Sequence, residues 1–127
     1  MSDVITREWL LSYLLNKPDA KESFPFNEST SVLKVCNKMF ALVGQHDGSM
    51  ILNLKCKPDE AAWLCDTYGA ITPGYHMDKK HWISIYFQLP DIEAPEMAQV
   101  TSLIDNSYML IVDNLPKSQR DDILSKL

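Results

Sequence analysis

Apolar positions recur along the chain with two different periods, and the change between them separates predicted helices from predicted strands. Near the N-terminus the period is helical, and one apolar stripe predicts a helix over 6–15: Ile5, Trp9, Leu10, Tyr13 and Leu14. Thr6 suits the N-cap of this helix, and Pro18 follows its end.

From residue 24 onward the apolar residues alternate, as they do in strands with one buried face. Strands are predicted over four segments, with a turn at 45–48 before the last: 24–28, 31–35, 38–43 and 50–56. Pro25 places the first strand at a sheet edge, because proline cannot donate to a ladder. Asn37 tolerates positive φ and predicts a two-residue hairpin turn, which directs Lys34 and Lys38 to opposite faces.

The second half of the chain has clear helix boundaries. Pro58 and Gly69 delimit a helix over 58–68, and the alternating run 81–87 predicts a further strand. A long helix begins near Glu96 and ends before Pro116. A short last helix follows, for which three apolar contacts are predicted: Ile123, Leu124 and Leu127.

This order of elements predicts a single α+β domain over 1–127, with an antiparallel sheet and helices packed on one face. A chain of 127 residues can bury its own core without crosslinks. Six large side chains are expected in that core: Trp9, Phe40, Leu54, Leu64, Ile85 and Ile104.

The composition also predicts the cellular location of the protein and the state of its cysteines. No apolar run is long enough to span a bilayer, and the N-terminus lacks the pattern of a signal peptide, so we expect a cytoplasmic protein. The three cysteines, Cys36, Cys56 and Cys65, form no CxxC pair and are expected to be reduced apolar residues.

The net charge of −5 argues against strong nucleic-acid binding, for which a basic surface is typical. The charge is unevenly distributed, however. Residues 29–90 hold six lysines against five acidic residues, whereas both flanking segments are acidic. A modest basic face is therefore compatible with the sequence.

The segment 72–82 has the highest density of polar and aromatic groups. Tyr75, His76, Lys79, Lys80 and His81 supply the donors and cations that contact phosphates, and Lys38 and Lys55 on predicted strands add to them. Tyr75 and Trp82 are also suited to stacking on the bases of a single strand. The alternative is structural: the aromatic residues and His76 would stabilise an irregular loop, and the lysines would form a solvated corner.

Catalytic and metal chemistry find little support. His76, Asp78 and His81 do not have the spacing of a known metal site. The four glycines are isolated, which excludes a glycine-rich phosphate loop, and no serine or cysteine lies in a nucleophile motif. We therefore expect neither enzymatic activity nor a cofactor.

Five short segments, in this order and spacing, resemble the MmcQ/YjbR-like family of small bacterial proteins: 34–35, 38–41, 54–56, 72–82 and 106–108. The resemblance implies a frataxin-like, double-wing sandwich and a role in DNA binding. In the last segment, Tyr108 lies on the apolar stripe of its helix, so its hydroxyl should bond a buried partner, for which the 72–82 loop is a candidate.

Two hypotheses for function remain open. One is weak DNA binding through the phosphate backbone, for example by a regulatory protein. The other is a protein-interaction or small-ligand module with no nucleic-acid role. The acidic balance supports the second, as does the presence of only two arginines, Arg7 and Arg120, because arginine is the usual reader of guanine.

Overall fold

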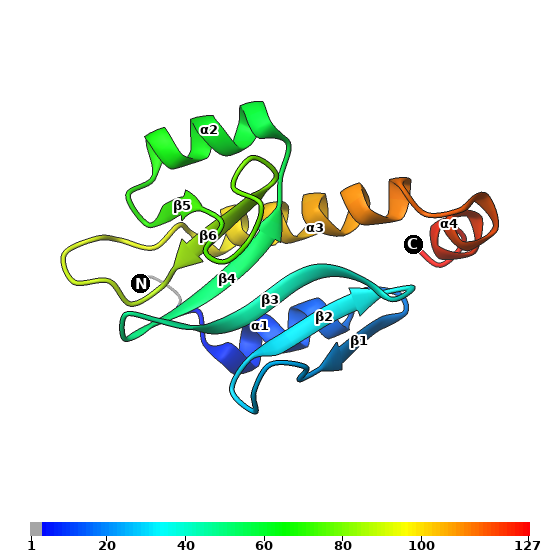
Figure 1. The fold of residues 1–127 in the computed structure, drawn as a ribbon, viewed down its shortest axis with the longest axis horizontal. Helices are drawn as coiled ribbons and strands as arrows, with labels where there is room; N and C mark the ends of the chain where they lie inside the picture. Colours follow the sequence, from blue (N-terminus) through cyan, green and yellow to red (C-terminus); the bar gives the residue numbers. More distant parts are fainter. Residues whose placement is uncertain (1–3) are drawn as a thin grey trace.

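A computed structural model describes residues 4–127, in which four helices and six strands form one α+β unit (Figure 1). In chain order the elements are α1 (Arg7–Leu15), β1 (Ala20–Ser23), β2 (Ser31–Val35), β3 (Lys38–His46), β4 (Ser49–Lys55), α2 (Pro58–Thr67), β5 (Ile71–Pro73), β6 (Trp82–Tyr86), α3 (Met97–Asp113) and α4 (Lys117–Leu124).

The six strands form one antiparallel sheet in the order β1-β2-β3-β4-β6-β5. Figure 1 shows α1 and α3 behind the sheet, whereas the face toward the viewer has no helix across its central strands. We call this second face the open face. The predicted fold class, with an antiparallel sheet and helices on one face, is confirmed.

Alternation along the strands places one set of side chains in the core beneath the helices. Met50, Leu52 and Leu54 of β4 lie in this core, as the sequence predicts, and the intervening residues face the open side. Five of the six predicted core residues are at most 1% exposed. Trp9 is the exception: it is half-buried and stacks on Tyr13 at the flank of α1, because Leu10 and Leu14 occupy the buried centre.

The turn between β2 and β3 forms as predicted. Cys36 and Asn37 both have positive φ, 49° and 64°, and the register pairs Val35 with Lys38. The next turn is shorter than predicted, since β3 continues to His46 and only two residues connect it to β4. These residues, Asp47 and Gly48, also have positive φ, as a tight hairpin requires.

The first predicted strand is wrong. The edge strand is β1 at Ala20–Ser23, and residues 24–30 form a loop in which Phe24 and Phe26 are 51% and 70% exposed. The alternating Phe-Pro-Phe pattern imitates a strand, but pairing with β2 is complete before it begins. Strand β5 was not predicted, because three residues are too few to produce a periodic signal.

A β-bulge in β3 shapes the centre of the sheet. Leu33 pairs with Ala41 and Lys34 with Met39, so Phe40 is an extra residue on β3. Ser107 of α3 bonds the backbone at this point: its hydroxyl donates to Phe40 O (2.6 Å) and accepts from Lys55 N (2.9 Å). One buried side chain thereby replaces ladder bonds that the bulge interrupts.

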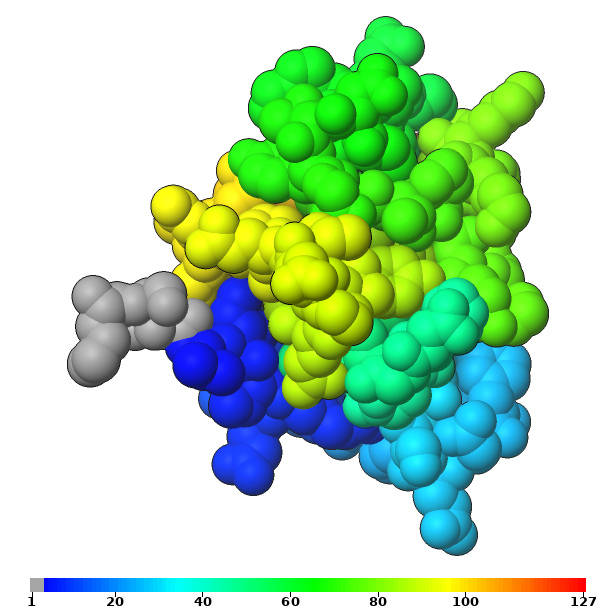
Figure 2. Space-filling view, turned by 90° about the vertical axis from the view of Figure 1, so that its left-hand side faces the viewer, coloured from blue at the N-terminus to red at the C-terminus, as the bar shows by residue number. Residues whose placement is uncertain are grey.

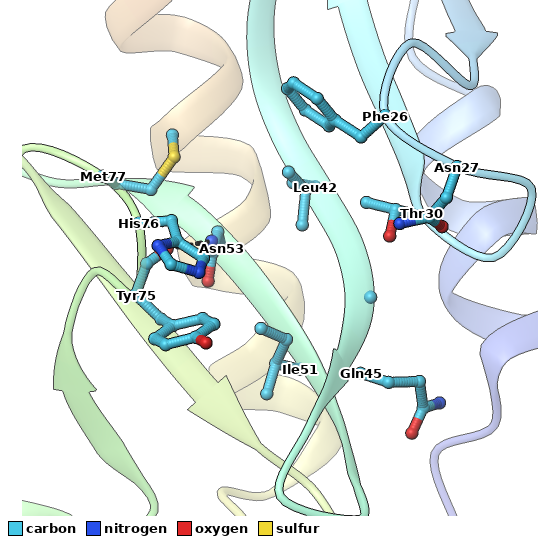
Figure 3. Close-up of a pocket in the computed structure, with 11 residues that line it drawn as sticks. Phe26, Asn27, Thr30, Leu42, Gln45, Ile51, Asn53, Tyr75, His76 and Met77 are labelled. Carbon is cyan, nitrogen blue, oxygen red and sulfur yellow. Dashed lines mark hydrogen bonds between the residues drawn. The ribbon is translucent and has the colours of Figure 1, made fainter.

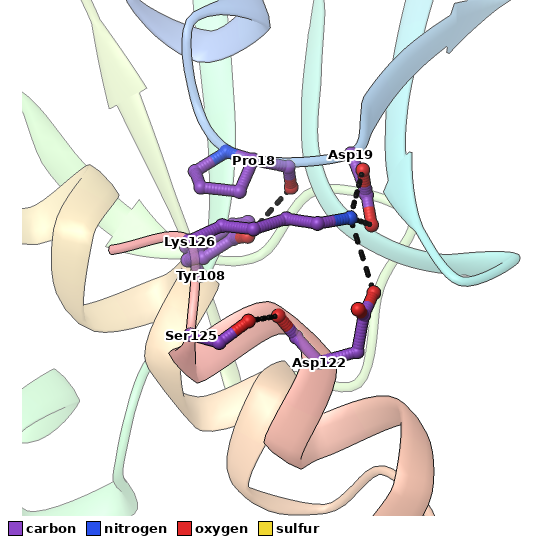
Figure 4. Close-up of polar contacts among 6 residues, drawn as sticks. All are labelled: Pro18, Asp19, Tyr108, Asp122, Ser125 and Lys126. Carbon is purple, nitrogen blue, oxygen red and sulfur yellow. Dashed lines mark hydrogen bonds and ion pairs between the residues drawn. The ribbon is translucent and has the colours of Figure 1, made fainter.

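Tyr108 connects α3 to the turn that follows α1, and not to the 72–82 loop as hypothesised. Its hydroxyl donates to Pro18 O (2.6 Å), and its ring meets Phe40 edge-on at 5.2 Å. Burial raises the pKa of Tyr108 to about 12, so the hydroxyl keeps its proton. Figure 4 shows Lys126 beside this contact, where it bridges Asp19 and Asp122.

The C-terminal helix contributes less to the core than expected. Ile123 is fully buried, but Leu124 and Leu127 are 42% and 63% exposed, so their predicted packing is wrong. The ion pairs of Lys126 hold this end of the chain against the α1–β1 turn instead.

Replacing Ser107 by alanine is expected to lower the free energy of unfolding by about 1–3 kcal/mol, because it leaves Lys55 N–H and Phe40 C=O without their partner in the interior. Urea denaturation provides the measurement. The matched control is Ser102→Ala on the exposed side of the same helix. Equal stability of the two variants would contradict this role of Ser107.

Candidate ligand site on the open face of the sheet

A cyclic set of hydrogen bonds holds the loop that follows β5, residues 74–81, against the open face. Tyr75 N donates to Ser84 Oγ (2.8 Å), Ser84 Oγ donates to Asn53 Oδ1 (2.5 Å), and Asn53 Nδ2 donates to Tyr75 O (3.2 Å). Asn53 and Ser84 are paired across β4 and β6 and are buried. Sequence reasoning missed both, although each is a polar residue inside an apolar strand.

Gly74 allows the loop to approach β6 closely. Its N–H donates to Trp82 O (2.8 Å), and a Cβ at this position would lie 2.7 Å from Trp82 Cβ and 3.1 Å from Trp82 O. No side chain fits there without displacing backbone. Trp82 itself is half-buried, which agrees with a mainly structural role for it in anchoring the loop.

The second half of the loop is organised by Asp78. Its carboxylate accepts from Lys80 N (2.9 Å) and lies 3.0 Å from His81 Nδ1, and these contacts lower the pKa of Asp78. Lys79 Nζ donates to Gly74 O (2.9 Å), so this ammonium group is directed back to the loop. The Lys80 side chain is exposed and is the more available of the two predicted cations.

Aromatic rings form the inner wall of the loop. Tyr75 stacks on His46 with ring centroids 3.7 Å apart, and His46 Nδ1 lies 2.6 Å from the hydroxyl of Tyr86. His76 follows with φ of 60°, a conformation unusual for a residue other than glycine, and its ring lies 4.0 Å from that of Tyr75. The ring of Tyr75 thus contacts both histidines and is half-buried, whereas His76 is exposed.

Between this wall and the 24–30 loop lies a pocket of about 440 Å³. Figure 3 shows Tyr75, His76 and Met77 on one side, Phe26, Asn27 and Thr30 on the other, and Leu42, Ile51 and Gln45 from the strands between them. In Figure 2 the two loops, light blue and yellow-green, lie along the same margin of the molecule.

Three lysines lie on the open face near the same end of the sheet. Lys21 of β1 pairs directly with Lys34 of β2, and Lys55 of β4 pairs with Trp82 of β6. Lys34 and Lys55 are half-buried. Lys38 alternates to the other face, as predicted, so the structure separates it from the candidate site.

Charge is segregated between strands and helices. The strands carry four lysines and one glutamate: Lys21, Lys34, Lys38, Lys55 and Glu22. The helices carry eight acidic and three basic residues: Glu8, Asp59, Glu60, Asp66, Asp105, Asp113, Asp121 and Asp122 against Arg7, Lys117 and Arg120. The helices therefore carry a net negative charge and the strands a net positive charge, while Glu28 and Asp78 lie in the two loops beside the pocket.

The arrangement of potential metal ligands and nucleophilic side chains gives little support to a metal site or to nucleophilic catalysis. His76 lines the pocket, whereas His81 bonds Asp78 in the outer part of the loop, and within residues 4–127 no three potential metal ligands gather. Burial raises the pKa of Cys56 to about 11 and also raises that of Cys65, which suppresses their thiolates at neutral pH. None of the described helices is long and apolar enough to cross a membrane.

A family model described as YjbR matches residues 15–110. The chain belongs to the YjbR family. It is 39% identical over 103 residues to the uncharacterised protein YbdF of Escherichia coli O157:H7, covering 81% of each chain. It is also 31% identical to YjbR of Escherichia coli K12, over 87% of this chain and 91% of that protein.

Solved structures share the fold of this YjbR-family chain. The crystal structure of Deinococcus radiodurans protein DR2400 aligns with a TM-score of 0.79 and 29% identity, covering 93% of this chain and 87% of that one. A crystal structure of a Pseudomonas syringae protein aligns with a TM-score of 0.69 and 25% identity, covering 84% and 98%. The family match includes the pocket and Ser107-Tyr108, and it confirms the family that the sequence motifs suggested.

Gly74→Ala is expected to destabilise the protein by about 1–3 kcal/mol, because the new Cβ would overlap Trp82 and force the loop off the sheet. Thermal or urea unfolding measures this effect. In Gly69→Ala, the control, the nearest atom is a methyl group of the exposed Ile92 at 3.3 Å, so a change within about 0.5 kcal/mol is expected. Similar losses in both variants would refute the close-approach argument.

Proposed function

We propose that this YjbR-family protein binds nucleic acid through the open face of its sheet, weakly and through the phosphate backbone, and that it catalyses no reaction. The supporting observation is the segregation of charge: the open face presents Lys21, Lys34 and Lys55, while the helices carry eight acidic residues against three basic ones. A chain with a net charge of −5 thus offers one face to a polyanion.

The pair formed by Lys21 and Lys34 strengthens this proposal. Like charges directly opposite each other on neighbouring strands destabilise a sheet. Lysine on an edge strand also protects against edge-to-edge aggregation, which explains Lys21 but not its half-buried partner Lys34. A phosphate between the two ammonium groups would relieve their repulsion.

The number of available cations sets the strength of binding. Lys21, Lys34, Lys55 and Lys80 supply three or four phosphate contacts, and at about 0.9 per contact the slope of log affinity against log salt is roughly −3. The dissociation constant then falls on the order of 10⁻⁴ to 10⁻⁶ M at physiological salt. Without an arginine on this face, little base-specific readout of a duplex is expected.

The test is a fluorescence-anisotropy titration of a random-sequence DNA duplex at several salt concentrations. Lys21→Gln/Lys80→Gln is expected to weaken binding and to reduce the magnitude of the salt slope by about 2, one unit for each lost phosphate contact. Because Lys21→Gln removes a like-charge pair, the variant should unfold at the same or a slightly higher urea concentration than the wild type.

The charge-matched control is Lys117→Gln/Arg120→Gln on α4, which removes two positive charges from the helical side. It should leave duplex affinity and salt slope nearly unchanged. The proposal fails if the wild type does not bind at low salt, or if the two double variants behave alike. Protein partners that survive nuclease treatment in a pull-down, together with absent DNA binding, would favour a protein-interaction module instead.

A further inference from the structure

One wall of the pocket includes an exposed aromatic side chain, Phe26, which is not part of the buried core. Phe26 is 70% exposed and lines the pocket across from His76 and Met77 (Figure 3). Large apolar side chains are normally buried, so an exposed phenylalanine next to a cationic surface needs another explanation. Proteins that bind single-stranded nucleic acids combine these two features, because bases stack on aromatic rings while cations follow the backbone.

Gly44, in the floor of the pocket, also indicates that a ligand binds there. Gly44 lies within β3, where glycine weakens a strand and marks a close approach of another group. A Cβ here would make ordinary contacts, 3.5 Å to Leu42 and 3.6 Å to Thr30, so the fold itself would accept alanine. The missing side chain instead keeps open the space above Leu42 and Ile51.

Polar groups at the rim match the edge of a planar heterocycle. Thr30 lines the pocket, and its hydroxyl, which can donate and accept, lies 3.6 Å from the position that a Cβ of Gly44 would occupy. Asn27 Oδ1 accepts from Ser29 N (2.9 Å), which orients the amide group of Asn27 and leaves its NH₂ as a donor. The volume of about 440 Å³ is within the range of about 300–1,000 Å³ that is usual for small-molecule sites.

We infer that the pocket receives an unstacked base of a single-stranded nucleic acid, with Phe26 and His76 against the base and the adjoining phosphates on the open-face lysines. This inference rests on the proposed function and refines it. In a duplex the bases are stacked and paired, so none is available without an unstacking cost. A single strand should therefore bind more tightly than the same sequence in duplex form.

The experiment compares a labelled mixed-sequence single strand with its annealed duplex by fluorescence anisotropy at one salt concentration. Phe26→Ala should weaken single-strand binding by about tenfold, the effect of losing one stacked base, and should leave duplex binding unchanged. Phe24→Ala is the matched control, since Phe24 is exposed in the same loop but does not line the pocket. Its affinity for the single strand should stay within about twofold of wild type.

A second pair of variants changes Gly44, in the floor of the pocket. Gly44→Phe fills the space and should abolish the preference for the single strand, whereas Gly44→Ala should retain it; a thermal melt checks that both are folded. Wild-type affinity in both Phe26→Ala and Gly44→Phe would overturn the inference, and intact duplex binding would then preserve the proposed function. Adenosine monophosphate binding as tightly as the strand would also overturn it, in favour of a free-nucleotide site.

Discussion

The hydrogen-bonded set of Asn53, Ser84 and the Tyr75 backbone is the interaction on which the candidate site depends. Asn53 and Ser84 are buried polar side chains on the open face of β4 and β6, and each obtains its partner from the other or from the loop. Leaving either one unpaired in the interior would cost about 1–3 kcal/mol, so the sheet and the loop position each other. The position of this loop in turn sets the aromatic wall, the pocket and the positions of Lys79 and Lys80.

On the covered face, side chains of α3 likewise provide hydrogen-bond partners for buried backbone groups. Ser107 bonds the backbone at the β3 bulge, and Tyr108 packs against Phe40 while it reaches back to Pro18. Two consecutive residues of α3 thus secure the helix to the centre of the sheet and to the turn after α1. The opposite face carries the pocket together with Lys21, Lys34 and Lys55.

Local patterns predicted much of the fold, and long-range contacts account for most of what they missed. The hairpin at Asn37 and the helix between Pro58 and Gly69 depend on neighbouring residues, so both are visible in the sequence. Ser107 and Phe40 are 67 residues apart, and Asn53 and Ser84 are 31 apart, so no local period reveals either pair. The prediction of a strand over 24–28 was wrong because alternation indicates a strand only where the edge of a partner strand is available. Of the predicted site residues, the structure places Tyr75 and His76 at the pocket and Lys38 on the other face.

The central claim is that nucleic acid meets the open face and not the helices. The most direct measurement is a titration of ¹⁵N-labelled protein with a short single strand, followed by amide chemical shifts. The account predicts that perturbed amides cluster at residues 21–34, 42–55 and 74–81, while those of α2 and α4 remain unchanged. Perturbations concentrated on α2 or α4, or none at saturating strand concentration, would contradict it.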